Sequence, residues 1–268
     1  MFRRSRAIAL VETATFMVIF FILAWYFQAS LGETYGWFSK TVMIILGLIG
    51  IFIHKDVKRY GLVPRNLRFS LKWSLYISLL FILLSLISIV IAFVIGSITP
   101  VDLRVIATDI LWFFVFVGLA EELFFRGYVQ SRLNEVFTAR YRSILGVKYQ
   151  WSQGTLITGF FFGIPHIFAG INPFMGYMRV TPVTIIVTGF ACFMGVIFGV
   201  LREKSEDIII PSVLHGFLVY TSFGIGKITG LAISGVASFL SLLLFFVLLF
   251  RRILEEKIDL KKDQVFVS

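Results

Sequence analysis

ILWFFVFVGLAEELFFR, residues 110–126, is the most informative stretch of this chain. Residues 110–120 carry no charge, which is typical of a helix inside a membrane. Two adjacent carboxylates, Glu121 and Glu122, follow directly, and Arg126 ends the stretch. Ionisable groups at that depth in a bilayer are costly, so these three residues are candidates for a functional site.

The composition of the whole chain indicates a polytopic membrane protein. Of the 268 residues, 58% are hydrophobic and 15% are charged, and the mean hydropathy is +0.92. These values are far too apolar for a soluble domain. The single cysteine, Cys192, excludes an intrachain disulfide framework and a cysteine-based zinc site. We expect an all-α fold, a single transmembrane helical domain over residues 1–268.

About eight apolar segments qualify as membrane spans, since a helix needs about 20 mostly apolar residues to cross a bilayer. The predicted spans are residues 7–29, 36–54, 70–98, 105–131, 153–170, 182–201, 208–225 and 231–250. The first run is longer than the apolar region of a signal peptide and is predicted to be a retained span. The small-xxx-small pairs Gly159/Gly163 and Gly195/Gly199 predict close helix packing. A catalytic core is expected within about residues 105–225.

The distribution of Lys and Arg predicts the orientation of the spans. With the N-terminus inside, 20 of the 25 basic residues fall on one side of the membrane, as the positive-inside rule requires. Of the others, Lys72 begins the third span, and Lys40, Arg104, Arg179 and Lys227 fall outside. We therefore expect a multi-pass protein of the cell membrane with both termini in the cytoplasm. The net charge of +10 is assigned to contact with anionic membrane lipids and not to nucleic acid.

Two histidines occur in apolar surroundings, His166 in the fifth predicted span and His215 in the seventh. At 1.5 Å per residue, His166 lies roughly 20 Å from the cytoplasmic start of its helix and His215 roughly 10 Å. Glu121 lies about 16 Å from Arg132 on the same scale. We expect these three groups to reach one buried polar cavity in the cytoplasmic half of the membrane. The third histidine, His54, is assigned to a solvated basic turn.

Helical geometry separates the roles of the two glutamates. Glu122 and Arg126 are four positions apart and lie on one face, so they are predicted to form a structural ion pair. Glu121 is rotated by about 100° from Glu122. It is predicted to be the free carboxylate that points into the cavity and acts as a general base.

The chain lacks the common motifs of hydrolytic enzymes, so a Glu/His/His site is the remaining candidate. The chain lacks His-Glu-x-x-His, Gly-x-Ser-x-Gly and a pair of deep intramembrane aspartates. Two mechanisms fit the site. In one, His166, His215 and a glutamate bind a divalent metal such as zinc, which activates a water. In the other, Glu121 and His166 polarise a water directly while His215 helps to stabilise the oxyanion. The sequence leaves both open, so the cofactor stays unknown.

The order of these motifs resembles the CAAX prenyl protease and bacteriocin-processing intramembrane proteases, also called the Abi or CPBP family. The family motifs are Glu-Glu-x-x-x-Arg, Phe-x-x-x-His and a histidine after a Pro/Ser helix start. In this chain they stand as Glu121, Glu122 and Arg126, as Phe162 and His166, and as His215 after Pro211 and Ser212. The resemblance spans roughly residues 110–222. Many members carry Asn four residues after the last histidine, where this chain has Val219, with Tyr220 or Thr221 as candidate replacements.

The resemblance implies a function as well as a fold. It implies an eight-helix bundle with a cytoplasm-facing cavity, an endopeptidase similar to the type II CAAX prenyl endopeptidases. The substrate would be a peptide or a lipid-modified protein, and Glu121, Glu122, Arg126, His166 and His215 would form the catalytic site. One alternative is a non-catalytic peptide-binding or bacteriocin-immunity protein that uses the same cavity. A small proton-linked transporter is another, although the chain has no visible inverted repeat.

Overall fold

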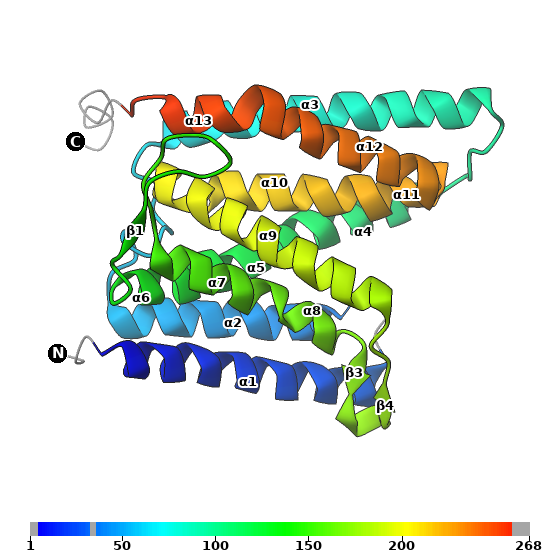
Figure 1. Cartoon of the computed structure of the whole chain (residues 1–268). Coiled ribbons are helices and arrows are strands. Elements are labelled where there is room, and N and C mark those ends of the chain that lie inside the picture. Colours follow the sequence, from blue (N-terminus) through cyan, green and yellow to red (C-terminus); the bar gives the residue numbers. More distant parts are fainter. Residues whose placement is uncertain (1–4, 33–35, 259–268) are drawn as a thin grey trace. The chain divides into compact units, whose positions relative to one another are not determined.

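The computed structural model of the chain describes residues 5–32 and 36–258 (Figure 1). The expected cytoplasmic residues Arg3, Arg4, Lys261 and Lys262 lie outside the described residues. The contacts of the chain cluster into two compact units, which are described separately. Unit 1 comprises Met1–Val63 and Ala120–Ile208, and unit 2 comprises Pro64–Leu119 and Ile209–Ser268. The single domain expected over residues 1–268 stays a prediction.

Unit 1 is a set of helices joined by short turns and two small hairpins. Its helical elements are α1 (Arg6–Leu31), α2 (Trp37–His54), α5 (Ala120–Glu122), the π-helix η2 (Leu123–Gln130), α6 (Ser131–Asn134), α7 (Gln153–Gly163), α8 (Pro165–Phe168), the 3-10 turn η3 (Pro173–Met175) and α9 (Pro182–Ser205). Strand β1 (Arg140–Tyr141) pairs antiparallel with β2 (Trp151–Ser152), and β3 (Ile171–Asn172) pairs antiparallel with β4 (Tyr177–Met178).

Unit 2 is built around the long helix α3 (Leu67–Val94). The remaining elements are α4 (Leu103–Leu111), η1 (Trp112–Leu119), α10 (Ile209–Val219), η4 (Tyr220–Gly224), α11 (Ile225–Thr229), α12 (Leu231–Leu244), η5 (Phe245–Phe250) and α13 (Arg251–Glu255). α3 packs on both α10 and α12, and α10 packs on η1. Gly118 makes the last of these contacts close, because a Cβ there would lie 2.8 Å from the carbonyl oxygen of Ser212.

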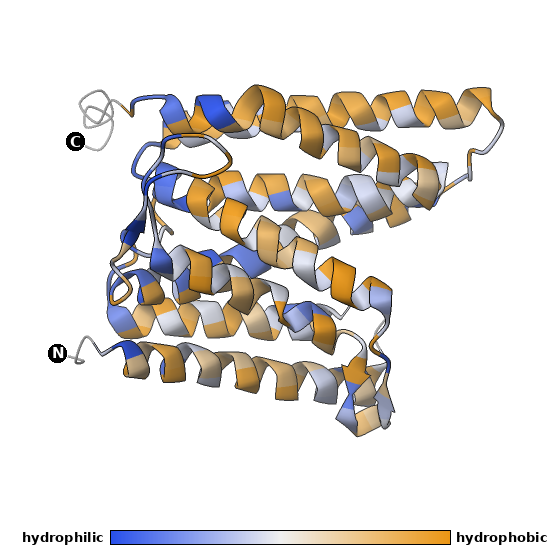
Figure 2. Ribbon diagram, viewed as in Figure 1, coloured by the Kyte–Doolittle hydropathy of each residue, from blue (hydrophilic) through white to orange (hydrophobic). Residues whose placement is uncertain are grey.

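The predicted all-α, polytopic membrane fold is confirmed. In the described part of the chain, seven helices are long and apolar enough to cross a membrane. They are Arg6–Leu31, Trp37–His54, Leu67–Val94, Leu103–Asn134, Pro182–Ser205, Ile209–Thr229 and Leu231–Glu255. Hydrophobic residues cover these helices along most of their length, as Figure 2 shows. Inside a bilayer, backbone N–H and C=O groups find no water to bond. A helix satisfies these groups within itself, which explains the all-α fold.

The fifth predicted span, residues 153–170, differs from the other seven because it is a broken helix. α7 ends at Gly163 and α8 begins at Pro165, where the proline ring removes a backbone donor and crowds the preceding turn. The segment still passes from one end of unit 1 to the other. Ser152, just before α7, donates to Glu203 at the C-terminal end of α9, and Asn172, after α8, donates to the carbonyl oxygen of Trp25 near the C-terminal end of α1.

Small residues hold α7 tightly against α9, as the glycine spacing predicts. A Cβ on Gly163 would lie 2.1 Å from the sulfur of Cys192, and a Cβ on Gly195 would lie 2.9 Å from the carbonyl oxygen of Gly159. Backbones can approach this closely only where side chains are missing. The predicted packing role of these glycines is confirmed, and it fixes the start of α8.

Candidate functional site

A pocket of about 400 Å³ lies within unit 1, between α1, α2, η2 and the break that separates α7 from α8. Six aromatic side chains contribute to its wall: Phe20, Phe21, Trp25, Phe125, Phe162 and Phe168. Its polar wall groups are Gln28, Ser39, Lys40, Glu121 and His166. Two of the predicted site residues, Glu121 and His166, are therefore brought together in one cavity, as a binding site with few and convergent polar groups requires.

Glu121 is not the free carboxylate that the sequence predicts. The ammonium group of Lys40, from α2, donates to Glu121 Oε1. Both side chains are largely shielded, with 19% and 12% of the Lys40 and Glu121 side chains exposed. The prediction was wrong on this point because Lys40 is 81 positions away from Glu121 in the chain, and nothing local shows that the two side chains meet. Its position one turn inside an apolar helix was the signal that it needs an acidic partner.

Glu122 and Arg126 form the ion pair that their spacing predicts. Arg126 Nε donates to Glu122 Oε2 over 2.9 Å, and both side chains are fully buried. The guanidinium carbon lies 4.7 Å from the ring centre of Phe162, close enough for a cation–π contact. The two terminal nitrogens of Arg126 have no hydrogen-bond partner among the described residues. The contact of Arg126 with Phe162 links η2 to α7, the helix that precedes His166 in α8.

His166 lies in α8, directly after the helix break at Pro165. Its Nδ1 lies 3.2 Å from the carbonyl oxygen of Gly163. A carbonyl oxygen only accepts, so Nδ1 carries the proton and a neutral ring has its lone pair on Nε2. The ring of Phe162 lies 5.6 Å away and limits the rotation of the imidazole. The break in the fifth span therefore presents His166 to the pocket.

His215 belongs to unit 2, where it lies in α10 and is buried at 5% exposure. A joint site of His215 with Glu121 and His166 stays a prediction. Val219 is the last residue of α10, directly before the π-helix η4. Of its two candidate replacements, Thr221 has its hydroxyl 3.2 Å from the hydroxyl of Ser85.

Residues 103–221 match the family model of the type II CAAX prenyl endopeptidase Rce1-like proteins. The match confirms the resemblance that the three motifs indicate. It includes all five predicted site residues, whereas Lys40 lies outside this Rce1-like segment. No curated protein and no solved structure matches the chain.

A divalent metal does not fit the pocket as the described residues form it. Nowhere in residues 5–32 and 36–258 does the structure gather three or more His, Cys, Asp or Glu side chains around a point that a metal ion could occupy. In the pocket itself, Glu121 already binds the ammonium of Lys40, and a bound cation would have to compete with that positive charge.

A second polar cluster in unit 1 corrects the assignment of His54 to a solvated turn. His54 is the last residue of α2, and its Nε2 lies 2.6 Å from Glu12 Oε1. Arg132 Nε donates to the other oxygen of Glu12 over 2.8 Å, and the Tyr128 hydroxyl donates to Oε1 over 2.9 Å. This cluster ties α1, α2 and η2–α6 together at the end of unit 1 where α1 begins. Its role is structural, and none of its members lines the pocket that holds Glu121.

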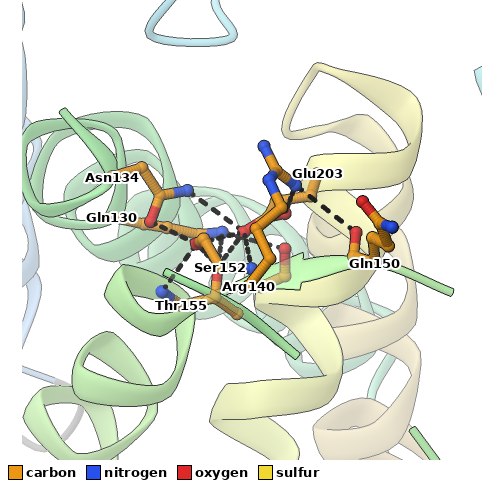
Figure 3. A network of polar contacts seen from close by, with 8 residues as sticks. Gln130, Asn134, Arg140, Gln150, Ser152, Thr155 and Glu203 are labelled. Atoms are coloured by element: carbon orange, nitrogen blue, oxygen red, sulfur yellow. Dashed lines mark hydrogen bonds and ion pairs between the residues drawn. The ribbon is translucent and has the colours of Figure 1, made fainter. Parts of the chain in front are cut away.

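A third network, centred on Glu203, anchors the β1–β2 hairpin (Figure 3). Glu203 Oε1 accepts hydrogen bonds from Ser152, Thr155 and Asn134. Arg140 Nη1 lies 3.3 Å from Glu203 Oε2. The carboxylate thus joins the C-terminal end of α9 to α6, to the start of α7 and to the hairpin. It fixes both ends of the chain segment that leads into α7 and α8.

Proposed function

We propose that the protein is an intramembrane endopeptidase similar to the type II CAAX prenyl endopeptidases. Its substrate would be a peptide or lipid-modified protein segment in the membrane. The observation that carries the proposal is the placement of Glu121 and His166 in the wall of one aromatic pocket, within the Rce1-like segment. A carboxylate at this cavity can supply the general base that peptide hydrolysis needs, and a protonated imidazole can supply a hydrogen-bond donor to the oxyanion.

Glu121 acts as the general base in this proposal. It accepts a proton from a water molecule, whose oxygen forms a bond to the carbonyl carbon of the scissile peptide. The carbonyl oxygen becomes an oxyanion, which donors of the pocket stabilise. Glu121 then passes the proton to the departing amide nitrogen as the C–N bond breaks. The immediate products are a carboxylic acid and an amine; transfer of the acid proton to the amine then leaves one carboxylate and one ammonium group, so atoms and charges balance.

His166 and His215 are proposed to stabilise the oxyanion. With Nδ1 donating to Gly163, a neutral His166 offers a lone pair at Nε2, and only its protonated form has a donor there. Protonation of His166 is therefore part of this proposal. The buried Glu122–Arg126 pair is proposed to position the helix that carries Glu121, since both of its members are withdrawn from solvent.

Loss of cleavage on loss of the Glu121 carboxylate tests this function. The purified full chain is reconstituted in liposomes with a set of membrane-anchored peptides, prenylated and unprenylated, and products are identified by mass spectrometry. We expect Glu121→Gln to lower the rate by at least about 100-fold, since a general base typically contributes that much. Glu255→Gln, an exposed residue of α13 paired with Arg251, serves as the control and retains the rate. Wild-type turnover in Glu121→Gln would overturn the proposal.

Val219 favours one alternative, a peptide-binding or immunity protein without turnover. The resembling family often carries an amide side chain at this position, and Val219 has no hydrogen-bonding side chain. In that case the same pocket would bind the peptide, and no product would form with the wild-type protein. Binding of a fluorescent peptide that survives in Glu121→Gln, together with the absence of any cleaved product, would support this alternative.

A further inference from the structure

The two ends of unit 1 differ sharply in basic residues. The turn after α2, the β1–β2 hairpin and the C-terminal end of α9 all carry several Lys or Arg side chains. These segments lie together. Arg202 of α9 donates to the carbonyl oxygen of Arg59 in the turn after α2, and also to the Ser131 hydroxyl over 2.7 Å. Arg140 of the hairpin pairs with Glu203 of α9. We call this the basic end of unit 1.

The pocket with Glu121 and His166 lies toward the other end. Lys40, its cationic wall residue, comes three positions after the start of α2 at Trp37, or about 5 Å along the helix. His54, at the basic end, lies about 21 Å beyond Lys40 along the same helix. The wall residues from α1 come from its second half, between Phe20 and Gln28.

Further contacts join α1, α8 and the β3–β4 hairpin at this other end. Asn172 Nδ2 donates to Gln28 Oε1 over 2.8 Å and joins the end of α1 to the β3–β4 hairpin. The ring of Phe168 packs edge-on against Phe21 and Trp25, with centroid distances of 4.9 and 5.9 Å. Of these three residues, Trp25 is of a type that is enriched at the interface between lipid and water. Among the residues described at this end of unit 1, Lys40 and Arg179 are the basic ones.

From this placement we infer that the pocket opens on the side of the membrane opposite to the cytoplasm. The positive-inside rule puts the basic end in the cytoplasm, and the pocket lies toward the other end. The cytoplasm-facing cavity that the resemblance implies does not agree with this placement. The inference rests on the proposed function where it names a substrate. The enzyme takes apolar peptide segments that have already crossed the membrane or that end in its outer half.

Labelling of single cysteines tests the inference without any need for catalysis. Cys192 is the sole cysteine of the chain, so the Cys192→Ser variant has no thiol that a maleimide could label. Ser39→Cys places a thiol in the pocket wall, and Ser143→Cys places a matched one at the exposed β1–β2 hairpin. Intact cells that produce the full chain are treated with a membrane-impermeant maleimide, before and after permeabilisation. We expect permeabilisation to raise labelling of Ser143→Cys at least about fivefold and to leave Ser39→Cys nearly unchanged.

The reverse pattern, with Ser143→Cys labelled in intact cells and Ser39→Cys only after permeabilisation, overturns the inference. If the pocket shields Ser39→Cys under both conditions, Met178→Cys decides. Met178 lies in β4 at the same end and is 76% exposed. Its labelling in intact cells supports the inference, and protection until permeabilisation overturns it. The same cysteines in a Glu121→Gln background separate the two proposals, since sidedness is then read in a protein without the proposed base.

Discussion

The ammonium group of Lys40 pairs with the carboxylate of Glu121 across the wall of the pocket in unit 1. The two residues are 81 positions apart in the chain. A carboxylate held by a cation in this way has a fixed direction, which a general base needs more than free rotation. Lys40 is therefore a positioning residue in the proposed reaction, and its removal provides the first prediction.

Replacement of Lys40 by Met should lower kcat and leave KM nearly unchanged. Misplacement of a catalytic group by about 1 Å costs about 100-fold in rate, whereas Lys40 is not proposed to bind the scissile bond. Lys40→Arg keeps the positive charge and should restore much of the rate. Steady-state kinetics in liposomes measure both constants. Lys72→Met, which breaks the exposed pair with Glu256 in unit 2, is the control. Equal kcat values for Lys40→Met and the wild type would exclude a positioning role.

Removal of one member of the buried Glu122–Arg126 pair should destabilise the protein strongly. Arg126→Met leaves Glu122 without the Nε donor at 2.9 Å, and breaking a buried pair costs about 3–5 kcal/mol. The double variant Glu122→Gln, Arg126→Met removes both charges and should recover part of that loss. Thermal unfolding in detergent measures the coupling. If the losses of the two single variants simply add in the double variant, the pair is not coupled as the structure requires.

The glycine contacts between α7 and α9 give a prediction about packing. Gly163→Ala should destabilise the protein by about 1–3 kcal/mol, the usual cost of overpacking, because the new methyl group meets Cys192. Gly235→Ala in α12 is the matched control, since a Cβ there meets nothing within 4 Å. That control should be neutral or stabilising by up to about 1 kcal/mol. Unfolding temperatures of the two variants compare them directly, and equal values would contradict the close approach of α7 to α9.

Buried tyrosines should make the folded chain less stable at alkaline pH. Burial and the nearby Glu135 carboxylate raise the pKa of Tyr60, in the turn after α2, above its ordinary value of 10.0. Burial and the charge of Glu203 raise the pKa of Tyr149, in the loop before β2, in the same direction. The unfolded chain therefore loses these protons first, so the stability that they contribute is present below about pH 10 and falls above it. Thermal unfolding between pH 8 and 11 should show this fall.

Tyr60→Phe removes one of these protons and should make the fall shallower. Tyr141→Phe, at an exposed tyrosine of β1, is its control and should leave the slope unchanged. Identical alkaline slopes in the wild type and Tyr60→Phe would show that Tyr60 does not contribute.

Local features of this protein are predictable from sequence because they depend on neighbours along one helix. Glu122 and Arg126 are about one helical turn apart, so their spacing alone predicts that they pair. The helical fold follows from the lengths of the apolar runs. The break at Pro165 had a local signal as well, but membrane helices often tolerate proline. The predicted span therefore continued through it.

Features that depend on the packing of distant helices were missed. Lys40 meets Glu121 because α2 packs closely on η2, where a Cβ on Gly47 would lie 3.2 Å from the Cα of Phe124. His54 meets Glu12, 42 positions earlier, for a similar reason. The spacing of residues within α1 or α2 does not predict either of these two contacts. A costly charge inside each helix indicates only that some partner must exist.

Hydrolysis at the pocket in unit 1 is the central claim, and the fate of the attacking oxygen tests it most directly. The reconstituted protein cleaves a membrane-anchored peptide in water enriched in ¹⁸O, and the products are weighed by mass spectrometry. The account predicts labelled oxygen in the new carboxylate with the wild type, and neither product nor label with Glu121→Gln. Cleavage that proceeds equally in Glu121→Gln, or a product without the label, would contradict it.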